Sequence, residues 1–156
     1  MNRTRLGRFV FVFQWFAALL LPAFVIVGRM LVGAEIGWLF VFGMFYGVFI
    51  IAAMLLPPLI TLADRGVRGL KSARRSYSIT SLALWGAMVM VGLTLPDQGD
   101  GPPLRPAVTV WTADLISIEA SGAICAVMVV AVVVAYAVLL VLAIKDALRW
   151  GALRES

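Results

Sequence analysis

The sequence contains no histidine and a single cysteine, and charged residues make up only 13% of its 156 positions. Without histidine, the chain lacks the usual base that activates a serine or cysteine nucleophile and the usual nitrogen ligand of zinc. The lone cysteine, Cys125, provides neither a disulfide framework nor a thiol pair for redox chemistry. These absences argue against an enzyme, a metal centre and a bound cofactor, and we expect none of the three.

Apolar surface, in contrast, is in excess. Hydrophobic residues account for 63% of the chain, and the mean hydropathy is +1.03. Soluble domains contain about 45–50% apolar and about 25% charged residues. A water-soluble fold of this length could not bury so much apolar surface, so the composition predicts an integral membrane protein. The pI near 10.1 reflects charges sorted into particular loops, and we expect no nucleic-acid partner.

Four segments are long and apolar enough to cross the roughly 30 Å hydrocarbon core of a bilayer. The sequence therefore predicts an all-α fold, a single membrane domain over residues 1–156 with four transmembrane helices in two hairpins. The basic start also fits a secretory signal peptide, but no A-x-A cleavage site follows Pro22, so we expect a retained first helix. We expect Pro57-Pro58 to end the second helix. The predicted spans are residues 9–28, 36–56, 79–95 and 123–144.

Charges divide the connecting segments into two groups. The N-terminal, central and C-terminal segments hold eleven Lys/Arg and three acids, whereas the other two loops hold two Arg and five acids. Basic residues concentrate in the cytoplasmic loops of membrane proteins. The sequence thus predicts that both termini and the loop 59–77 are cytoplasmic. The amino-acid usage is typical of bacteria with GC-rich genomes, so we expect a multi-pass protein of a bacterial plasma membrane.

The central loop 59–77 is the most polar stretch of the chain, with five cations and one acid, Asp64. On a helical wheel its aliphatic residues share one side and its cations the other, which is typical of a helix lying among lipid headgroups. Gly66 and Gly69 favour an irregular loop instead. In either conformation we expect contact with anionic lipid at the cytoplasmic face. The residues expected to make it are Arg65, Arg68, Lys71, Arg74 and Arg75.

The outer loop 96–119 has two parts. Its first part is rich in turn residues, and because Asp97 and Asp100 lack the spacing of a calcium loop, we interpret them as a solvated turn. Residues 106–118 are semi-apolar and too short to cross a bilayer, so they form either an interfacial helix or a loop. Their Trp111 indicates either a contact with a partner protein or a headgroup anchor. Ser117 is placed to cap the fourth helix.

Three residues inside the spans are candidates for helix packing. Gly43 and Gly47 form a small-xxx-small motif, which lets another helix approach closely, either within this bundle or from a second subunit. Gln14 is the only amide inside a span. Such residues commonly hydrogen-bond a neighbouring helix, so we interpret Gln14 as a packing residue and not as a ligand-binding one.

No ionisable residue other than Tyr and Cys lies within the four predicted spans. Ion-coupled transporters and proton relays place such groups in the membrane because their chemistry needs them. The sequence therefore favours a non-enzymatic accessory or regulatory component of a larger membrane complex. The alternative is a small transporter or channel subunit that forms an oligomer through Gly43 and Gly47. The expected partners are the lipid bilayer and either another membrane protein or further copies of this chain.

Overall fold

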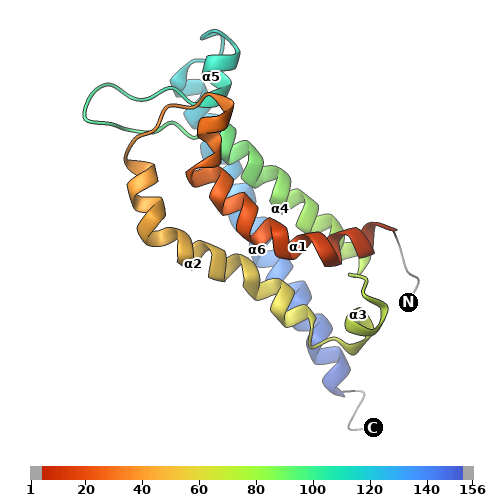
Figure 1. Cartoon of the computed structure of the whole chain (residues 1–156). Helices are drawn as coiled ribbons and strands as arrows, with labels where there is room; N and C mark the ends of the chain where they lie inside the picture. The colour runs from red at the N-terminus through yellow and green to blue at the C-terminus, as the bar shows by residue number, and fades with distance from the viewer. Residues whose placement is uncertain (1–4, 153–156) are drawn as a thin grey trace.

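The computed structural model describes residues 5–152, without the side chains of Arg65 and of residues 149–152. The regular elements in this range are helices, and four of them are long and apolar enough to cross a membrane (Figure 1). The predicted all-α class and the four helices of spanning length are confirmed. The long helices are α1 (Arg5–Ile26), α2 (Trp38–Thr61), α4 (Arg75–Thr94) and α6 (Ile118–Ala152); the short ones are η1 (Gly28–Val32), α3 (Arg65–Leu70) and α5 (Ala107–Trp111).

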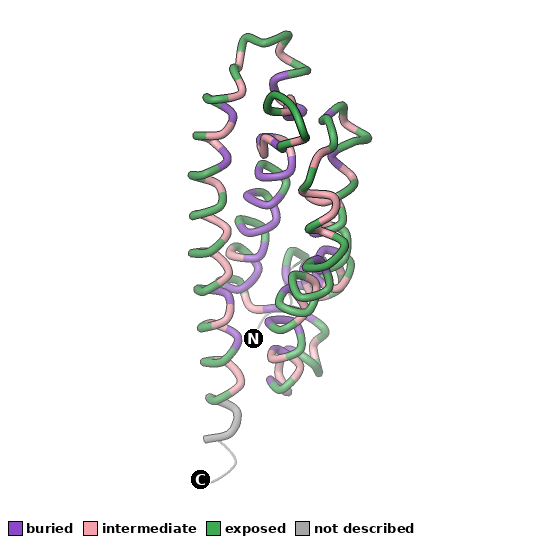
Figure 2. The backbone as a smooth tube through the Cα atoms, turned by 90° about the vertical axis from the view of Figure 1, so that its left-hand side faces the viewer, coloured by how far each residue is buried: buried purple, intermediate pink, exposed green. Residues whose placement is uncertain are grey.

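The four long helices form a ring of contacts. α4 packs against α1 and α6, and α2 closes the ring by packing against the same two helices. α4 is the most buried of the four: ten of its residues are buried, compared with five in α2. Figure 2 shows this as a column of buried positions inside the bundle, whereas the long straight α6 is exposed along much of its length.

The polarity of the helices explains which one lies inside. α4 carries several hydroxyl side chains, and those of Ser78 and Ser81 donate to the carbonyl oxygens four residues earlier, at 3.0 and 2.8 Å. Packing inside the bundle shields these groups from hydrocarbon, where unsatisfied polar atoms are costly. α6 is built mainly from Val and Ala and α2 from Phe and aliphatic residues, so both can face lipid at little cost.

The prediction that Pro57-Pro58 ends the second helix is wrong, because α2 continues through both prolines to Thr61. A proline at position 57 cannot donate a hydrogen bond to the carbonyl oxygen of Ala53. The hydroxyl of Tyr136, on α6, donates to that oxygen at 2.7 Å. A neighbouring helix therefore satisfies the backbone group that the proline leaves free, as a membrane helix requires.

The segments between the spans are more helical than expected. The predicted loop 59–77 contains the end of α2, the short helix α3 and the start of α4. Residues 106–118, for which helix and loop were both open, contain α5 followed by a turn in which Ala113 and Asp114 have positive φ angles. Ser117 caps α6 as predicted, because its hydroxyl accepts a hydrogen bond from the Ala120 amide at 3.1 Å.

Gly43 and Gly47 of α2 face α1 of the same chain. A Cβ at Gly43 would lie 2.2 Å from Cγ2 of Ile26, and a Cβ at Gly47 would lie 3.0 Å from its Cδ1. Even an alanine at Gly43 would therefore overlap with Ile26. The two glycines set the short distance between α1 and α2, as small residues do in membrane bundles.

We expect Gly43→Ala to destabilise the purified protein by about 1–3 kcal/mol, because overpacking forces the two helices apart. The matched control is Gly86→Ala, since a Cβ at Gly86 would meet no atom within 4 Å. That control should be neutral or slightly stabilising, because alanine favours a helix over glycine.

Thermal unfolding in detergent measures both changes, and adding Ile26→Ala should restore part of the loss in Gly43→Ala. Equal midpoints for Gly43→Ala and the unmodified chain would contradict the close α1–α2 contact.

Candidate functional site

The bundle has two ends of opposite charge. At the basic end α1 and α4 begin and α2 and α6 end. Two contacts show that these helix ends lie together: the Ala73 amide donates to Gly7 O at 2.9 Å, and Arg74 pairs with Asp146 at 3.2 Å. The charged side chains described there are Arg5, Arg8, Arg68, Lys71, Arg74, Arg75 and Lys145, with Asp64 and Asp146. Those at the opposite, acidic end are Arg29 and Arg105, with Glu35, Asp97, Asp100, Asp114 and Glu119.

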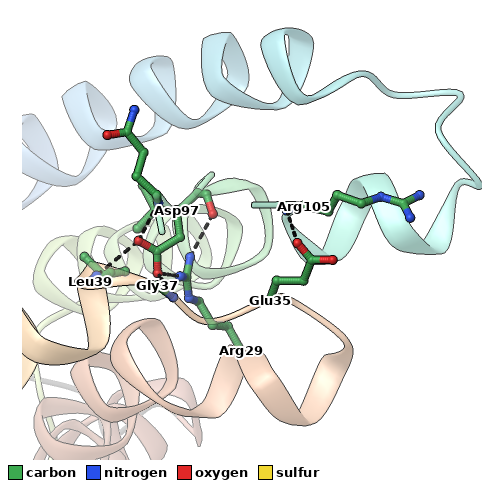
Figure 3. A network of polar contacts seen from close by, with 8 residues as sticks. Arg29, Glu35, Gly37, Leu39, Asp97 and Arg105 are labelled. Atoms are coloured by element: carbon green, nitrogen blue, oxygen red, sulfur yellow. Dashed lines mark hydrogen bonds and ion pairs between the residues drawn. The ribbon is translucent and has the colours of Figure 1, made fainter. Parts of the chain in front are cut away.

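A buried ion pair lies at the acidic end (Figure 3). The guanidinium of Arg29, in η1, pairs with the carboxylate of Asp97, just after α4, and the two side chains are 2% and 5% exposed. Arg29 also donates to Leu95 O at 2.8 Å. Burial lowers the pKa of Arg29 from its ordinary value, and the charge of Asp97 opposes this shift. The interpretation of Asp97 as part of a solvated turn is therefore wrong.

The same carboxylate caps α2. The residue at the N-cap position, Gly37, has no side chain that could accept the first amides of the helix. Asp97 Oδ2 accepts from the Gly37 amide at 2.9 Å, Asp97 Oδ1 from the Leu39 amide at 3.1 Å, and Gln98 O from the Trp38 amide at 2.8 Å. The segment can approach this closely because position 37 is glycine: a Cβ there would lie 2.1 Å from Gln98 O.

Two further contacts tie the α1–α2 connection to the segment after α4. Glu35 Oε2 accepts from the Arg105 amide at 2.9 Å, and the Glu35 amide donates to Arg105 O at 3.1 Å (Figure 3). The guanidinium of Arg105 pairs with Asp114 at 2.6 Å, where both side chains are exposed. Exposed pairs contribute only about 0–1 kcal/mol, whereas loss of one partner of a buried pair is strongly destabilising because it leaves an uncompensated buried charge.

A second network holds the basic end together. The fully buried Asp64 caps α3, because its Oδ1 accepts from the amides of Gly66 and Val67 at 2.8 and 3.3 Å. Its Oδ2 accepts from Nε and Nη2 of Arg74 at 3.2 and 2.9 Å. Arg74 Nε also lies 3.2 Å from a carboxylate oxygen of Asp146, on α6. Arg74 thus connects the α2–α3 link to the start of α4 and to α6.

This network separates the five predicted lipid-contacting residues. Arg74 is engaged by two carboxylates within the protein. Arg68, Lys71 and Arg75 are exposed at the same end, whereas the side chain of Arg65 lies outside the described residues. The predicted lipid contact stays a prediction for all five residues, and Arg68, Lys71 and Arg75 are the ones whose described side chains are exposed.

The remaining candidates differ in their surroundings. Gln14 is buried, donates to Phe11 O at 3.1 Å and accepts from the Tyr77 hydroxyl at 3.1 Å, so it joins α1 to α4. Gly43 and Gly47 contact α1, as described above. Trp111 is 57% exposed at the end of α5, and both its predicted roles stay predictions.

The interior of the bundle offers a small apolar cavity of about 120 Å³. Side chains from all four long helices line it. Among the described residues, no group of three His, Cys, Asp or Glu side chains could hold a metal ion. The lining residues are Pro22, Val25, Ile26, Ile50, Met88, Val91, Val129 and Val132.

Neither the buried Arg29–Asp97 pair nor the partly buried Asp64–Arg74 pair was predicted from the sequence. Asp97 is 68 residues from Arg29, and no local pattern reports a contact over that separation. Two signals were nevertheless present. α2 begins at Trp38 without a capping side chain before it, and Arg29 directly follows an apolar segment in a loop that is otherwise acidic.

We expect Asp97→Asn to destabilise the protein by about 3–5 kcal/mol, because it leaves the Arg29 guanidinium buried without a counter-charge. The matched control is Asp114→Asn, which breaks an exposed pair and should cost about 1 kcal/mol or less. Thermal unfolding in detergent measures both.

Arg29→Met should restore part of the stability of Asp97→Asn, because the double variant no longer buries an unpaired charge. Equal small losses in Asp97→Asn and Asp114→Asn would show that the buried pair does not hold this end together.

No known family model, curated protein or solved structure matches this chain. A functional argument therefore depends on the chemistry of its own surfaces. Two of these surfaces, one on α2 and one on α1, carry features that packing within the chain does not explain.

Proposed function

We propose that the chain is a non-enzymatic accessory component of a larger complex in a bacterial plasma membrane, and that it binds its partner through one face of α2. This α2 face consists of Phe42, Phe45, Tyr46 and Phe49, which follow each other at helical spacing and are all more than half exposed. Aromatic residues are enriched at protein–protein contacts because they provide a large rigid area. Lipid could cover the three phenylalanines equally well, so only the tyrosine distinguishes a protein partner from lipid.

Tyr46 is the observation that carries the proposal. It lies well inside α2 and is 60% exposed, and its hydroxyl has no hydrogen-bond partner among the described residues. The other two tyrosines donate to partners on neighbouring helices, Tyr77 to Gln14 and Tyr136 to Ala53. An unpaired hydroxyl in hydrocarbon costs about 1–3 kcal/mol by mutational measures. A partner helix with a hydrogen-bond acceptor would remove that cost, whereas lipid tails have none.

The alternative, an oligomeric transporter or channel subunit assembled through Gly43 and Gly47, has less support. Both glycines already pack against Ile26 of α1. A second subunit could reach them only if α1 moved away. The proposed accessory role uses an adjoining face of α2 whose side chains are exposed.

The proposed orientation places the basic end in the cytoplasm, because cytoplasmic loops are enriched in Lys and Arg. We expect Gly101→Cys to react with a membrane-impermeant maleimide in intact cells and Gly69→Cys to react only after the membrane is opened. A Cβ at either glycine would meet no atom within 4 Å, so both variants should fold, and the native Cys125 is buried. Labelling of Gly69→Cys in intact cells would reverse the orientation.

We expect Tyr46→Phe to leave the stability of the isolated protein unchanged, because its hydroxyl makes no hydrogen bond to the residues that the structure describes, and to reduce recovery of the partner under mild detergent. The matched control, Tyr136→Phe, removes the hydrogen bond to Ala53 O and should lower the unfolding temperature. A Tyr46→Phe variant that unfolds earlier than the unmodified chain would indicate a role inside the bundle.

A photo-reactive residue at Phe45 gives the direct test. It should cross-link to one unrelated membrane protein in native membranes, while the same residue at the lipid-facing Val134 of α6 should label lipid. An adduct of twice the chain's own mass would favour the oligomeric alternative, and labelling of lipid alone at both positions would contradict partner binding.

A further inference from the structure

A shallow, open groove of about 500 Å³ follows the first half of α1, and its lining side chains all belong to that helix. Its lining comes from positions spaced by three and four residues, which places them on one face of the helix. Two cations, Arg5 and Arg8, lie at its basic end, and apolar side chains continue from there into the span: Phe9, Val12, Phe13 and Phe16. Phe9, Val12 and Phe16 are more than half exposed.

Aromatic contacts hold one wall of this groove in place. The rings of Phe9 and Phe13 stack with their centroids 5.1 Å apart. Both rings also meet Trp85 of α4 edge-on, at 6.4 and 5.2 Å. Because α4 is the most buried helix, the wall is fixed against the centre of the bundle and is formed before any ligand arrives.

The cations of the groove have no counter-charge from the described part of the chain. Arg5 and Arg8 are exposed and make no ion pair there. The two carboxylates described at this end, Asp64 and Asp146, are both paired with Arg74. The positive end of the α1 dipole adds to the same local charge. The groove therefore combines an unneutralised cationic rim with an apolar floor.

We propose that this groove binds one anionic phospholipid. Arg5 and Arg8 hold the headgroup phosphate, because guanidinium groups bind phosphate oxygens through paired, charge-assisted hydrogen bonds. One acyl chain lies along Phe9, Val12 and Phe16. The helical rise of about 1.5 Å per residue puts Phe16 roughly 12 Å further along α1 than Arg8, so the cations lie at one end of the groove and the phenylalanines follow beside the acyl chain.

The test uses the purified full-length chain in detergent, with phosphatidylglycerol and phosphatidylcholine of identical acyl chains as probes and native mass spectrometry as the readout. The unmodified protein should retain one phosphatidylglycerol in preference to phosphatidylcholine. Arg5→Gln with Arg8→Gln should weaken that retention about 10-fold or more, because both charge-assisted contacts to the headgroup phosphate are lost.

The matched control is Arg68→Gln with Lys71→Gln, which removes the same charge from the same end but leaves the groove intact. It should keep the bound lipid. Equal losses in the two double variants would overturn the site, because they would show attraction by net charge alone. Retention that survives Arg5→Gln with Arg8→Gln would overturn it as well.

Two additional measurements test the two halves of the site separately. Arg5→Lys with Arg8→Lys keeps the charge but loses the paired geometry, and should give an intermediate retention. Glycerol 3-phosphate, which has the phosphate but no chain, should not displace the lipid. If it competes as well as a phospholipid, the site is a phosphate site and the acyl-chain half of the proposal fails.

Discussion

The carboxylate of Asp97 is the group on which the arrangement at the acidic end depends. It neutralises the buried guanidinium of Arg29 and accepts the first amides of α2 while lying just after α4. The end of α1, the start of α2 and the end of α4 are therefore fixed to one another by a single side chain. Buried charges are stable only when paired and fully hydrogen-bonded, so these three helix ends must form together.

The remainder of the bundle follows from the lack of a hydrophobic driving force between helices in lipid. Close packing at small residues and a few polar contacts must supply the specificity. Gly43 lets α1 approach α2, Gln14 joins α1 to α4, and Ser121 donates from α6 to Thr94 O at 2.7 Å. The helix with the most hydroxyl groups, α4, accordingly lies inside, while the Val-rich and Phe-rich helices form the outer surface.

The two proposed binding surfaces lie on neighbouring helices and have different chemistry. The α2 face presents aromatic rings and, inside the span, the Tyr46 hydroxyl, which has no partner in the described part of the chain. The α1 groove presents two cations at the basic end beside a fixed aromatic wall. A partner helix and an anionic lipid could therefore bind at the same time. The α2 face would select the helix through the Tyr46 hydroxyl, and the α1 groove would select the lipid through its two arginines.

The sequence by itself determined the number and type of the long helices and the division of charge between the two ends. These properties depend on composition and on runs of neighbouring residues, and each can be read within about 20 positions. It also identified Gly43, Gly47 and Gln14 as packing residues, but it left open which helix they would meet.

Only the tertiary structure decided the features that join distant segments. Asp97 caps a helix that begins about 60 residues earlier. The α2 helix continues through Pro57 because Tyr136, 83 residues from Ala53, donates a hydrogen bond to the Ala53 carbonyl oxygen. That Tyr46, Arg5 and Arg8 find no partner among the residues 5–152 that the structure describes is also a tertiary property. Whether a side chain has a partner depends on all the residues that pack around it in the fold. It therefore cannot be read from its neighbours in the sequence.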